Sequence, residues 1–125
     1  MKKIILTDKA PAPIGPYSQG IDPGSLVFFS GQIAIDPTAG KIVATDVEGQ
    51  TRQVLSNIRA LLAASSLTPA DVVKTTVFVK NMGDFAKVNA IYAELFPSEP
   101  PARSCVEVSA LPSGALVEIE VIAAR

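Results

Sequence analysis

Ala102-Arg103-Ser104-Cys105-Val106-Glu107-Val108 and Leu116-Val117-Glu118-Ile119-Glu120-Val121-Ile122-Ala123 are the two stretches of sequence that decide the fold. In both, side chains of different character alternate with the period of two that is typical of a β-strand. Between them, Leu111-Pro112-Ser113-Gly114 has the composition of a turn. The sequence therefore predicts two strands near the C-terminus. It leaves open whether they pair directly or lie apart in one sheet.

The alternation divides each predicted strand into two faces. The first strand carries Ser104, Val106 and Val108 on one face and, on the other, Arg103, Cys105 and Glu107. The second carries Val117, Ile119, Val121 and Ala123 on one face and, on the other, Leu116, Glu118, Glu120 and Ile122. If both strands belong to one sheet, their apolar faces are expected to agree. The opposite face then collects one guanidinium, one thiol and three carboxylates.

This charged face has two interpretations. It is a solvated sheet surface with ordinary charges, as many antiparallel sheets have, or it is a binding site. In a site, the planar fork of Arg103 matches a carboxylate ligand, and a nearby carboxylate accepts a proton from water. Glu118 and Glu120 are spaced alike and point the same way, so spacing does not choose between them.

The preceding part of the chain predicts four more strands and two helices. The strands are expected at residues 4–7, 26–35, 41–43 and 72–80, all rich in apolar or β-branched residues. Thr45 and Glu48 have the spacing of a capping box and predict a helix that ends near residues 65–66. Asp84 and Pro97 delimit a second helix, in which Asn89 is expected to be exposed or bonded locally.

Two features of the N-terminal part bear on a site. Residues 10–20 contain three prolines and two glycines, which exclude regular structure and can hold Tyr17 in place. The alternative is that Tyr17 only packs its ring and bonds its hydroxyl locally. Gly31 interrupts the strand predicted at 26–35, which indicates a β-bulge or the close approach of another group.

The order of elements predicts one α+β domain over residues 1–125, in two layers. Two helices are expected to cover one face of a single mixed β-sheet. The other face contains Cys105, Leu116, Ile122 and half of residues 26–35. So many apolar side chains are unfavourable on a surface exposed to water. A second subunit that covers this face would resolve the difficulty.

Composition excludes several classes of protein. The chain has no apolar run of the ~20 residues that a membrane span needs, and its N-terminus meets charge too soon for a signal peptide, so a cytoplasmic protein is expected. Lys plus Arg (11) nearly balances Asp plus Glu (12) without a basic run, which disfavours nucleic-acid binding. One Cys and no His exclude an intrachain disulfide, the usual zinc sites and His-dependent triads. Proton transfer is then left to carboxylates, Tyr, Lys, Cys or water.

Several motifs together resemble the YjgF/RidA family. They are, in chain order, Ile14-Gly15-Pro16-Tyr17-Ser18-Gln19-Gly20, Phe29-Ser30-Gly31-Gln32-Ile33, Asn89-Ala90-Ile91-Tyr92, Pro101-Ala102-Arg103-Ser104-Cys105-Val106 and Leu111-Pro112-Ser113-Gly114-Ala115-Leu116-Val117-Glu118-Ile119-Glu120. The resemblance runs from about residue 4 to the C-terminus. It implies a chorismate-mutase-like fold and a homotrimer with clefts between adjacent subunits.

The resemblance also implies an activity: hydrolytic deamination of reactive enamines and imines, 2-aminoacrylate/2-iminopropanoate and 2-iminobutanoate, to 2-oxo acids and ammonia. Neither a cofactor nor a metal is implied. Arg103 would bind the substrate carboxylate, Glu118 would position or deprotonate the attacking water, and Tyr17 would close the pocket. Ser30 and Gly31 would line it, and Cys105 would place a backbone group beside the substrate rather than act as a nucleophile.

Two alternatives to the deaminase stay open. The first is a non-catalytic small-molecule-binding or chaperone-like trimer that uses the same clefts. The presence of Arg103 favours the enzyme, because relatives without this residue lose the anchor for the substrate carboxylate. The second is an endoribonuclease, which the near-neutral charge, the low pI of about 5.3 and the absence of His disfavour.

Overall fold

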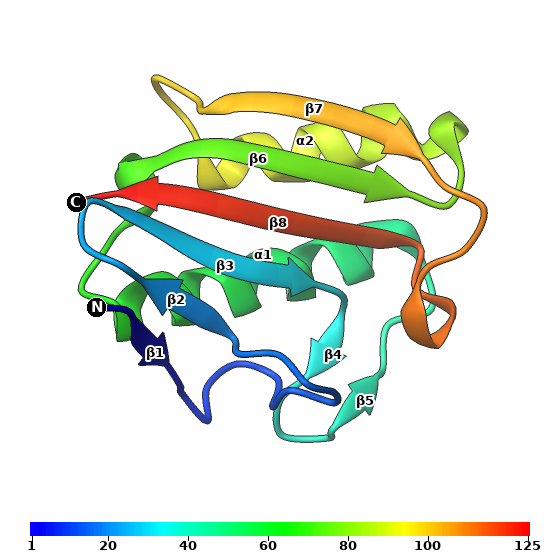
Figure 1. Ribbon diagram of the computed structural model, residues 1–125. Coiled ribbons are helices and arrows are strands. Elements are labelled where there is room, and N and C mark those ends of the chain that lie inside the picture. The colour runs from blue at the N-terminus through cyan, green and yellow to red at the C-terminus, as the bar shows by residue number, and fades with distance from the viewer.

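The computed structural model describes residues 1–125 and contains a six-stranded sheet in the order β1-β2-β3-β8-β6-β7 (Figure 1). All neighbours are antiparallel except β6 and β7, which are parallel. The sheet is therefore mixed, as expected. Its strands, in sheet order, are β1 (Lys3–Ile5), β2 (Gly20–Asp22), β3 (Leu26–Gln32), β8 (Val117–Ala124), β6 (Val72–Val79) and β7 (Ala102–Glu107).

Two helices, α1 (Val47–Ala64) and α2 (Phe85–Leu95), lie behind the sheet, both on the same face (Figure 1). The predicted α+β class, with a mixed sheet and two helices on one face, is confirmed. Three short 3₁₀ turns connect the elements, at Pro69–Asp71, Met82–Asp84 and Pro112–Gly114. A separate two-stranded hairpin of β4 (Ile35–Asp36) and β5 (Lys41–Ile42) lies beyond the end of β3.

The core lies between the helices and the sheet. It is one cluster of 24 buried apolar residues to which every layer contributes, with Val54, Val77 and Val117 fully buried. One face of α1 is buried against the sheet; its buried residues include Val47, Thr51, Val54, Leu55, Ile58, Leu61 and Leu62. Since each large aliphatic side chain buried here contributes roughly 1.5–3 kcal/mol, this cluster is the main stabilising element of the fold.

Some predicted boundaries were wrong. The strand expected at 26–35 ends at Gln32, and Ile35 begins a separate hairpin strand. The first helix is capped by Asp46 instead of Thr45, since the carboxylate of Asp46 accepts a hydrogen bond from the amide of Gly49 at 3.0 Å. Asp84 does precede α2, but its side chain makes no capping bond.

The arrangement of β7 corrects the expectation that the charged groups share one face. Thr75 of β6 lies between Arg103 of β7 and Val121 of β8 in the register, and Phe78 pairs with Glu118. Residues opposite one another in adjacent strands point to the same side of the sheet. Arg103 and its face of β7 therefore lie on the helix side with the apolar face of β8, while Glu118 lies on the open side.

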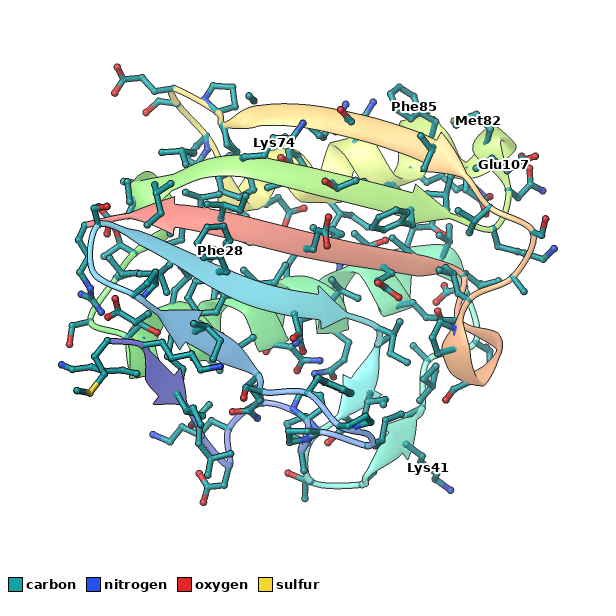
Figure 2. The ribbon with its side chains drawn as sticks, viewed as in Figure 1. Phe28, Lys41, Lys74, Met82, Phe85 and Glu107 are labelled. Atoms are coloured by element: carbon teal, nitrogen blue, oxygen red, sulfur yellow. The ribbon has the colours of Figure 1, made fainter.

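The open face of the sheet, which no helix covers, is largely apolar. Phe28 is 44% exposed and Ile4 66%, and they belong to this face with Ile21 and Ile122. Figure 2 shows Phe28 and Lys74 on the side of the sheet that faces away from the helices. An apolar sheet face without a covering layer is confirmed, with Cys105 as an exception because it lies on the helix side.

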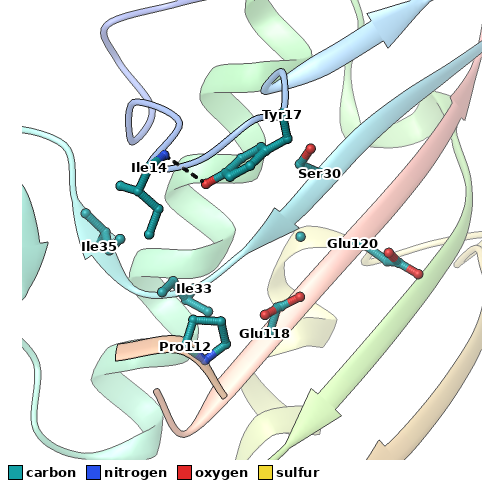
Figure 3. A pocket seen from close by; sticks show the side chains of 9 residues that line it. Ile14, Tyr17, Ser30, Ile33, Ile35, Pro112, Glu118 and Glu120 are labelled. Atoms are coloured by element: carbon teal, nitrogen blue, oxygen red, sulfur yellow. Dashed lines mark hydrogen bonds between the residues drawn. The ribbon is translucent and has the colours of Figure 1, made fainter. Parts of the chain in front are cut away.

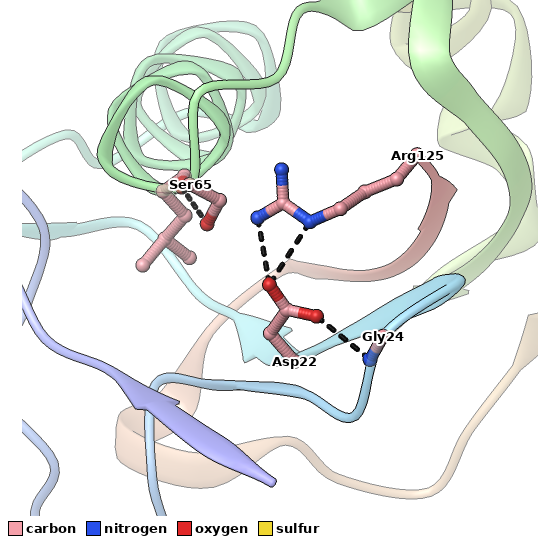
Figure 4. Close-up of polar contacts among 5 residues, drawn as sticks. Asp22, Gly24, Ser65 and Arg125 are labelled. Atoms are coloured by element: carbon pink, nitrogen blue, oxygen red, sulfur yellow. Dashed lines mark hydrogen bonds and ion pairs between the residues drawn. The ribbon is translucent and has the colours of Figure 1, made fainter. Parts of the chain in front are cut away.

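An ion pair joins the C-terminal end of β2, at Asp22, to Arg125, the residue that follows β8. Nε and Nη2 of Arg125 both donate to Oδ2 of Asp22, at 2.9 and 2.7 Å, and Oδ1 accepts from the amide of Gly24 (Figure 4). The Arg125 guanidinium holds the pKa of Asp22 below its usual value. None of the helices is long and apolar enough to cross a lipid bilayer.

Candidate active site

A pocket of about 420 Å³ lies where the N-terminal loop, β3, β8 and the 3₁₀ turn before β8 meet (Figure 3). It combines apolar walls with two carboxylates, one hydroxyl and one phenol. Its lining residues are Ile14, Tyr17, Ser30, Gly31, Ile33, Ile35, Pro112, Glu118 and Glu120. Four of the six site residues predicted from sequence, Tyr17, Ser30, Gly31 and Glu118, are thus brought together by the fold.

Glu118 is the half-buried acid of this pocket. Its position near the start of β8 directs the side chain to the open face of the sheet, next to β3. No hydrogen bond or ion pair within the chain involves its carboxylate. Burial, and secondarily the charge of Glu120, raise the pKa of Glu118 above its usual value. An unpaired carboxylate of raised pKa in a pocket is suited to exchange a proton with a bound molecule.

Gly31 makes room for that carboxylate. The β3–β8 register passes from Phe29 opposite Val121 to Gln32 opposite Ile119, so that two residues of β3 face one of β8. This is the predicted bulge. A Cβ atom at position 31 would collide with the Glu118 carboxylate and come within 2.9 Å of its Cδ. The group that approaches the backbone closely at Gly31 is therefore the Glu118 side chain.

Tyr17 lies at the mouth of the pocket, and the residue is 48% exposed. Its hydroxyl accepts a hydrogen bond from the amide of Ile14 at 3.3 Å (Figure 3). Ser30 lines the pocket, but its hydroxyl donates to the carbonyl of Ser18 at 2.6 Å. Ser30 thus attaches the loop that carries Tyr17 to the sheet.

Gln19 is a residue that sequence analysis missed, and it organises the same loop. It is only 1% exposed. Its Oε1 accepts from the amide of Thr7 at 2.7 Å, and its Nε2 donates to the carbonyls of Thr7 and Pro11 at 2.9 and 2.8 Å. The proline-rich loop has no partner strand, so these side-chain bonds replace the ladder that regular structure would supply. A glutamine gives no periodic signal in a loop, and this role was visible only in three dimensions.

Arg103 and Cys105 are not in the pocket, which corrects the expectation that they share a face with Glu118. They lie on the helix side of edge strand β7, and β6 separates them from β8. Burial raises the pKa of the Cys105 thiol, and the charge of Arg103 opposes that shift. Alternation predicted the faces within each strand correctly, but the apolar faces of the two strands do not match. The reason is that an edge strand can expose either face.

The half-buried guanidinium of Arg103 is held by α2. Its Nη1 donates to Oδ1 of Asn89 at 2.6 Å, and its Cζ lies 4.8 Å from the ring centroid of Tyr92 and 5.4 Å from that of Phe85. The expectation that Asn89 is exposed or bonded locally was wrong, because its amide binds a residue 14 positions further along the chain. The chain offers no group of three or more metal-ligating side chains that could hold a metal ion.

Comparison with known proteins gives full-length matches. The family model described as Endoribonuclease L-PSP matches residues 7–125. A 2-iminobutanoate/2-iminopropanoate deaminase from Salmonella typhimurium is 54% identical over 128 residues, which cover 100% of this chain and 99% of that protein. A RutC family protein from Pyrococcus horikoshii is 55% identical over 123 residues, 98% of each chain.

Solved structures agree with these matches. The crystal structure of Escherichia coli TdcF with bound serine superposes with a TM-score of 0.94 at 47% identity, and covers 98% of both chains. Since the family model spans nearly the whole chain and the relatives share about half of its residues, the chain belongs to the Endoribonuclease L-PSP family, also called the YjgF/RidA family.

Proposed function

We propose that this protein is a hydrolytic deaminase of reactive 2-imino acids, with 2-iminopropanoate and 2-iminobutanoate as its substrates and the 2-oxo acids and ammonia as products. The observation that carries the proposal is the full-length identity of 54% to a relative with this activity in its name. The pocket supports it independently, since it offers an acid of raised pKa beside a tyrosine hydroxyl.

The proposed site requires more than one copy of the chain. Glu118 and Arg103 lie on opposite faces of the sheet and on strands separated by β6, roughly 10 Å apart at the usual strand spacing. A three- or four-carbon imino acid is too small to contact both within one copy. We propose a homotrimer in which the β7 edge of one subunit, with Arg103 and Cys105, borders the pocket of the next. The apolar open face of the sheet would then be covered by neighbouring subunits.

In this arrangement the chemistry follows from the residues. Arg103 binds the substrate carboxylate and orients C2 of the imine toward a water molecule beside Glu118. Glu118 accepts a proton as the water oxygen bonds to C2, and the C=N electron pair moves to nitrogen, which takes up a proton. In the resulting carbinolamine the hydroxyl gives up its proton and the nitrogen takes up another, so that a C=O bond forms as the C–N bond breaks and ammonia leaves. Tyr17 closes the pocket and offers its hydroxyl to substrate or water.

A coupled assay tests the proposal. A serine dehydratase would generate 2-aminoacrylate in place while semicarbazide competes for the imine, and formation of the 2-oxo acid would be followed. The wild type is expected to speed 2-oxo acid release and reduce trapping. Arg103→Ala is expected to lower the rate by about a hundredfold or more, because the charge-assisted anchor is lost.

Cys105→Ala, the control from the same strand face, is expected to keep much of the activity. A fully active Arg103→Ala protein would contradict the assigned roles. Identical rates for wild type, variant and blank would contradict deamination and favour a binding protein that uses the same clefts.

We further propose that RNA is not the substrate, despite the description attached to the family model. The formal net charge is −1, and the chain has no basic run. A true RNA-binding protein of this size is expected to bind strongly at low salt and weaken steeply as salt rises. Tight, salt-dependent binding of single-stranded RNA by the purified protein would contradict this proposal.

A further inference from the structure

Arg103 forms no ion pair with a carboxylate of its own chain. The two ion pairs of the chain join Arg52 to Glu94 and Arg125 to Asp22, and Arg103 takes part in neither. The atom that accepts its hydrogen bond at 2.6 Å is the neutral amide oxygen of Asn89. A half-buried arginine is commonly neutralised by a carboxylate, so this neutral partner is a specific feature of the site.

The other groups around the guanidinium are also neutral. Burial raises the pKa of the Tyr92 phenol and of the Cys105 thiol, so both carry their protons at neutral pH. The rings of Tyr92 and Phe85 lie near the guanidinium carbon and attract its charge without cancelling it. The charge of Arg103 therefore remains available to an anion that binds beside it.

The contacts that fix Arg103 come from one face of α2. Phe85, Asn89 and Tyr92 are spaced by four and three residues, which places them along one stripe of the helix. Tyr92 is itself immobilised, since its hydroxyl shares a hydrogen bond of 2.7 Å with the buried Thr75 hydroxyl. The guanidinium is thus held by a rigid element through two rings and a single hydrogen bond.

We propose that Asn89 is a positioning residue, whose neutral amide fixes the Arg103 guanidinium while leaving its charge and its remaining N–H groups for the substrate carboxylate. Of the five N–H donors of an arginine, only one on Nη1 is occupied here. The inference rests on the proposed function, in which Arg103 is the carboxylate anchor. The inference explains why residue 89 is an asparagine and not an aspartate.

The Asn89→Asp variant separates charge from geometry, because the two side chains have the same shape. An aspartate would hold Arg103 at least as firmly through a charge-assisted hydrogen bond. If Asn89 had only a structural role, this variant would be as active as the wild type or more so. If the role of Asn89 is to leave the charge free, the aspartate competes with the substrate carboxylate and weakens its binding.

The test measures binding of 2-oxobutanoate by titration calorimetry, together with kcat and KM for enzymatically generated 2-iminobutanoate. Asn89→Asp is expected to raise Kd and KM by about tenfold or more, with kcat changed by less than about threefold and Tm unchanged or higher. Asn89→Ala is expected to lower kcat as well as affinity, since the guanidinium loses its fixed orientation. Asn81→Asp makes the same substitution at an exposed residue outside the Arg103 contacts, and it should match the wild type.

The outcomes distinguish this inference from the proposed function. An active wild type with an equally tight Asn89→Asp variant would overturn the role of Asn89 and leave the deaminase intact. A wild type that does not deaminate, but binds 2-oxobutanoate more tightly than Asn89→Asp does, would overturn the activity and support the role of Asn89. A wild type with neither activity nor binding would overturn both.

Discussion

At the scale of single residues, the protein places an acid in the pocket without a partner. The carboxylate of Glu118 has no hydrogen bond or ion pair within the chain, and Gly31 lacks the side chain that would displace it. Its neighbour Glu120 is exposed and lines the same pocket. Spacing alone did not separate the two acids, whereas the structure does, because burial raises the pKa of Glu118 and no comparable burial applies to Glu120.

The Glu118→Gln variant is expected to be more stable and less active than the wild type. Because burial raises the pKa of Glu118, the folded protein binds the proton more tightly than the unfolded chain, and ionisation costs folding stability. This cost is absent below the ordinary carboxyl pKa, grows as pH rises through the raised value, and is complete above it. Removing the charge should raise the free energy of unfolding at neutral pH by less than about 1 kcal/mol, since the group is partly solvated.

Urea unfolding at acidic and neutral pH, with activity measured in parallel, checks this prediction. The stability gain should disappear as pH falls below the ordinary carboxyl pKa of about 4.3, because the wild-type carboxyl is then protonated in both the folded and the unfolded state. Activity should fall by about a hundredfold or more. Glu120→Gln is the matched control and should keep most of the activity. If Glu120→Gln were the inactive variant, the roles of the two acids would be reversed.

At the scale of elements, irregular segments build the pocket and regular ones support it. The loop before β2 carries Tyr17 over the pocket, although no backbone ladder binds the loop to the sheet. Its attachment comes from the Gln19 side chain, from the bond that the Ser30 hydroxyl donates to the carbonyl of Ser18, and from a single backbone bond from the Ser30 amide to the Gln19 carbonyl at 2.9 Å. The bulge that places Ser30 in β3 is the one that leaves room for Glu118. One irregularity of the strand thus positions both walls of the site.

Gln19→Ala is expected to loosen this loop while the sheet and helices stay folded. The substitution removes the partners of the Thr7 amide and of the Thr7 and Pro11 carbonyls. Leaving part-buried backbone groups unpaired costs about 2 kcal/mol or more. Hydrogen exchange should therefore become faster in residues 7–19 and remain slow in β6 and β8, and activity should fall because Tyr17 is no longer held.

Gln53→Ala serves as the control for the loss of a glutamine. The Gln53 side chain makes a single bond, to Asn57, within α1. This variant should leave exchange in the loop and the activity unchanged. Unaltered exchange in residues 7–19 of Gln19→Ala would contradict the role given to Gln19.

At the scale of the whole molecule, the two halves of the proposed site lie on different sides of the sheet. The pocket with Glu118 opens on the uncovered face, and Arg103 lies with α2 behind the edge strand β7. The uncovered face is apolar around Phe28, which is 44% exposed. A trimer in which sheets pack against one another accounts for both features, since it would bury this face and bring the edge of one copy to the pocket of another.

Phe28→Lys is expected to break the proposed assembly. A charge buried against an apolar partner surface without a counter-charge is strongly unfavourable. The variant should sediment as a monomer, retain its secondary structure and lose deaminase activity. Val43→Lys, a charge placed at another exposed apolar residue, away from the sheet face, should stay assembled and active. A wild type that sediments as a monomer, or an active and assembled Phe28→Lys protein, would contradict the proposal.

The sequence by itself determined the class of fold, the presence of both helices, the irregularity of the strand at Gly31 and the family. These depend on local periodicity, on the conformational limits of proline and glycine, and on motifs that are contiguous in the chain. Only the tertiary structure decided which faces of β7 and β8 coincide, because alternation defines two faces within each strand but not their match across an intervening strand. For the same reason, the separation of Arg103 from Glu118, the bond from Arg103 to Asn89 and the anchoring role of Gln19 depended on contacts between residues distant in sequence.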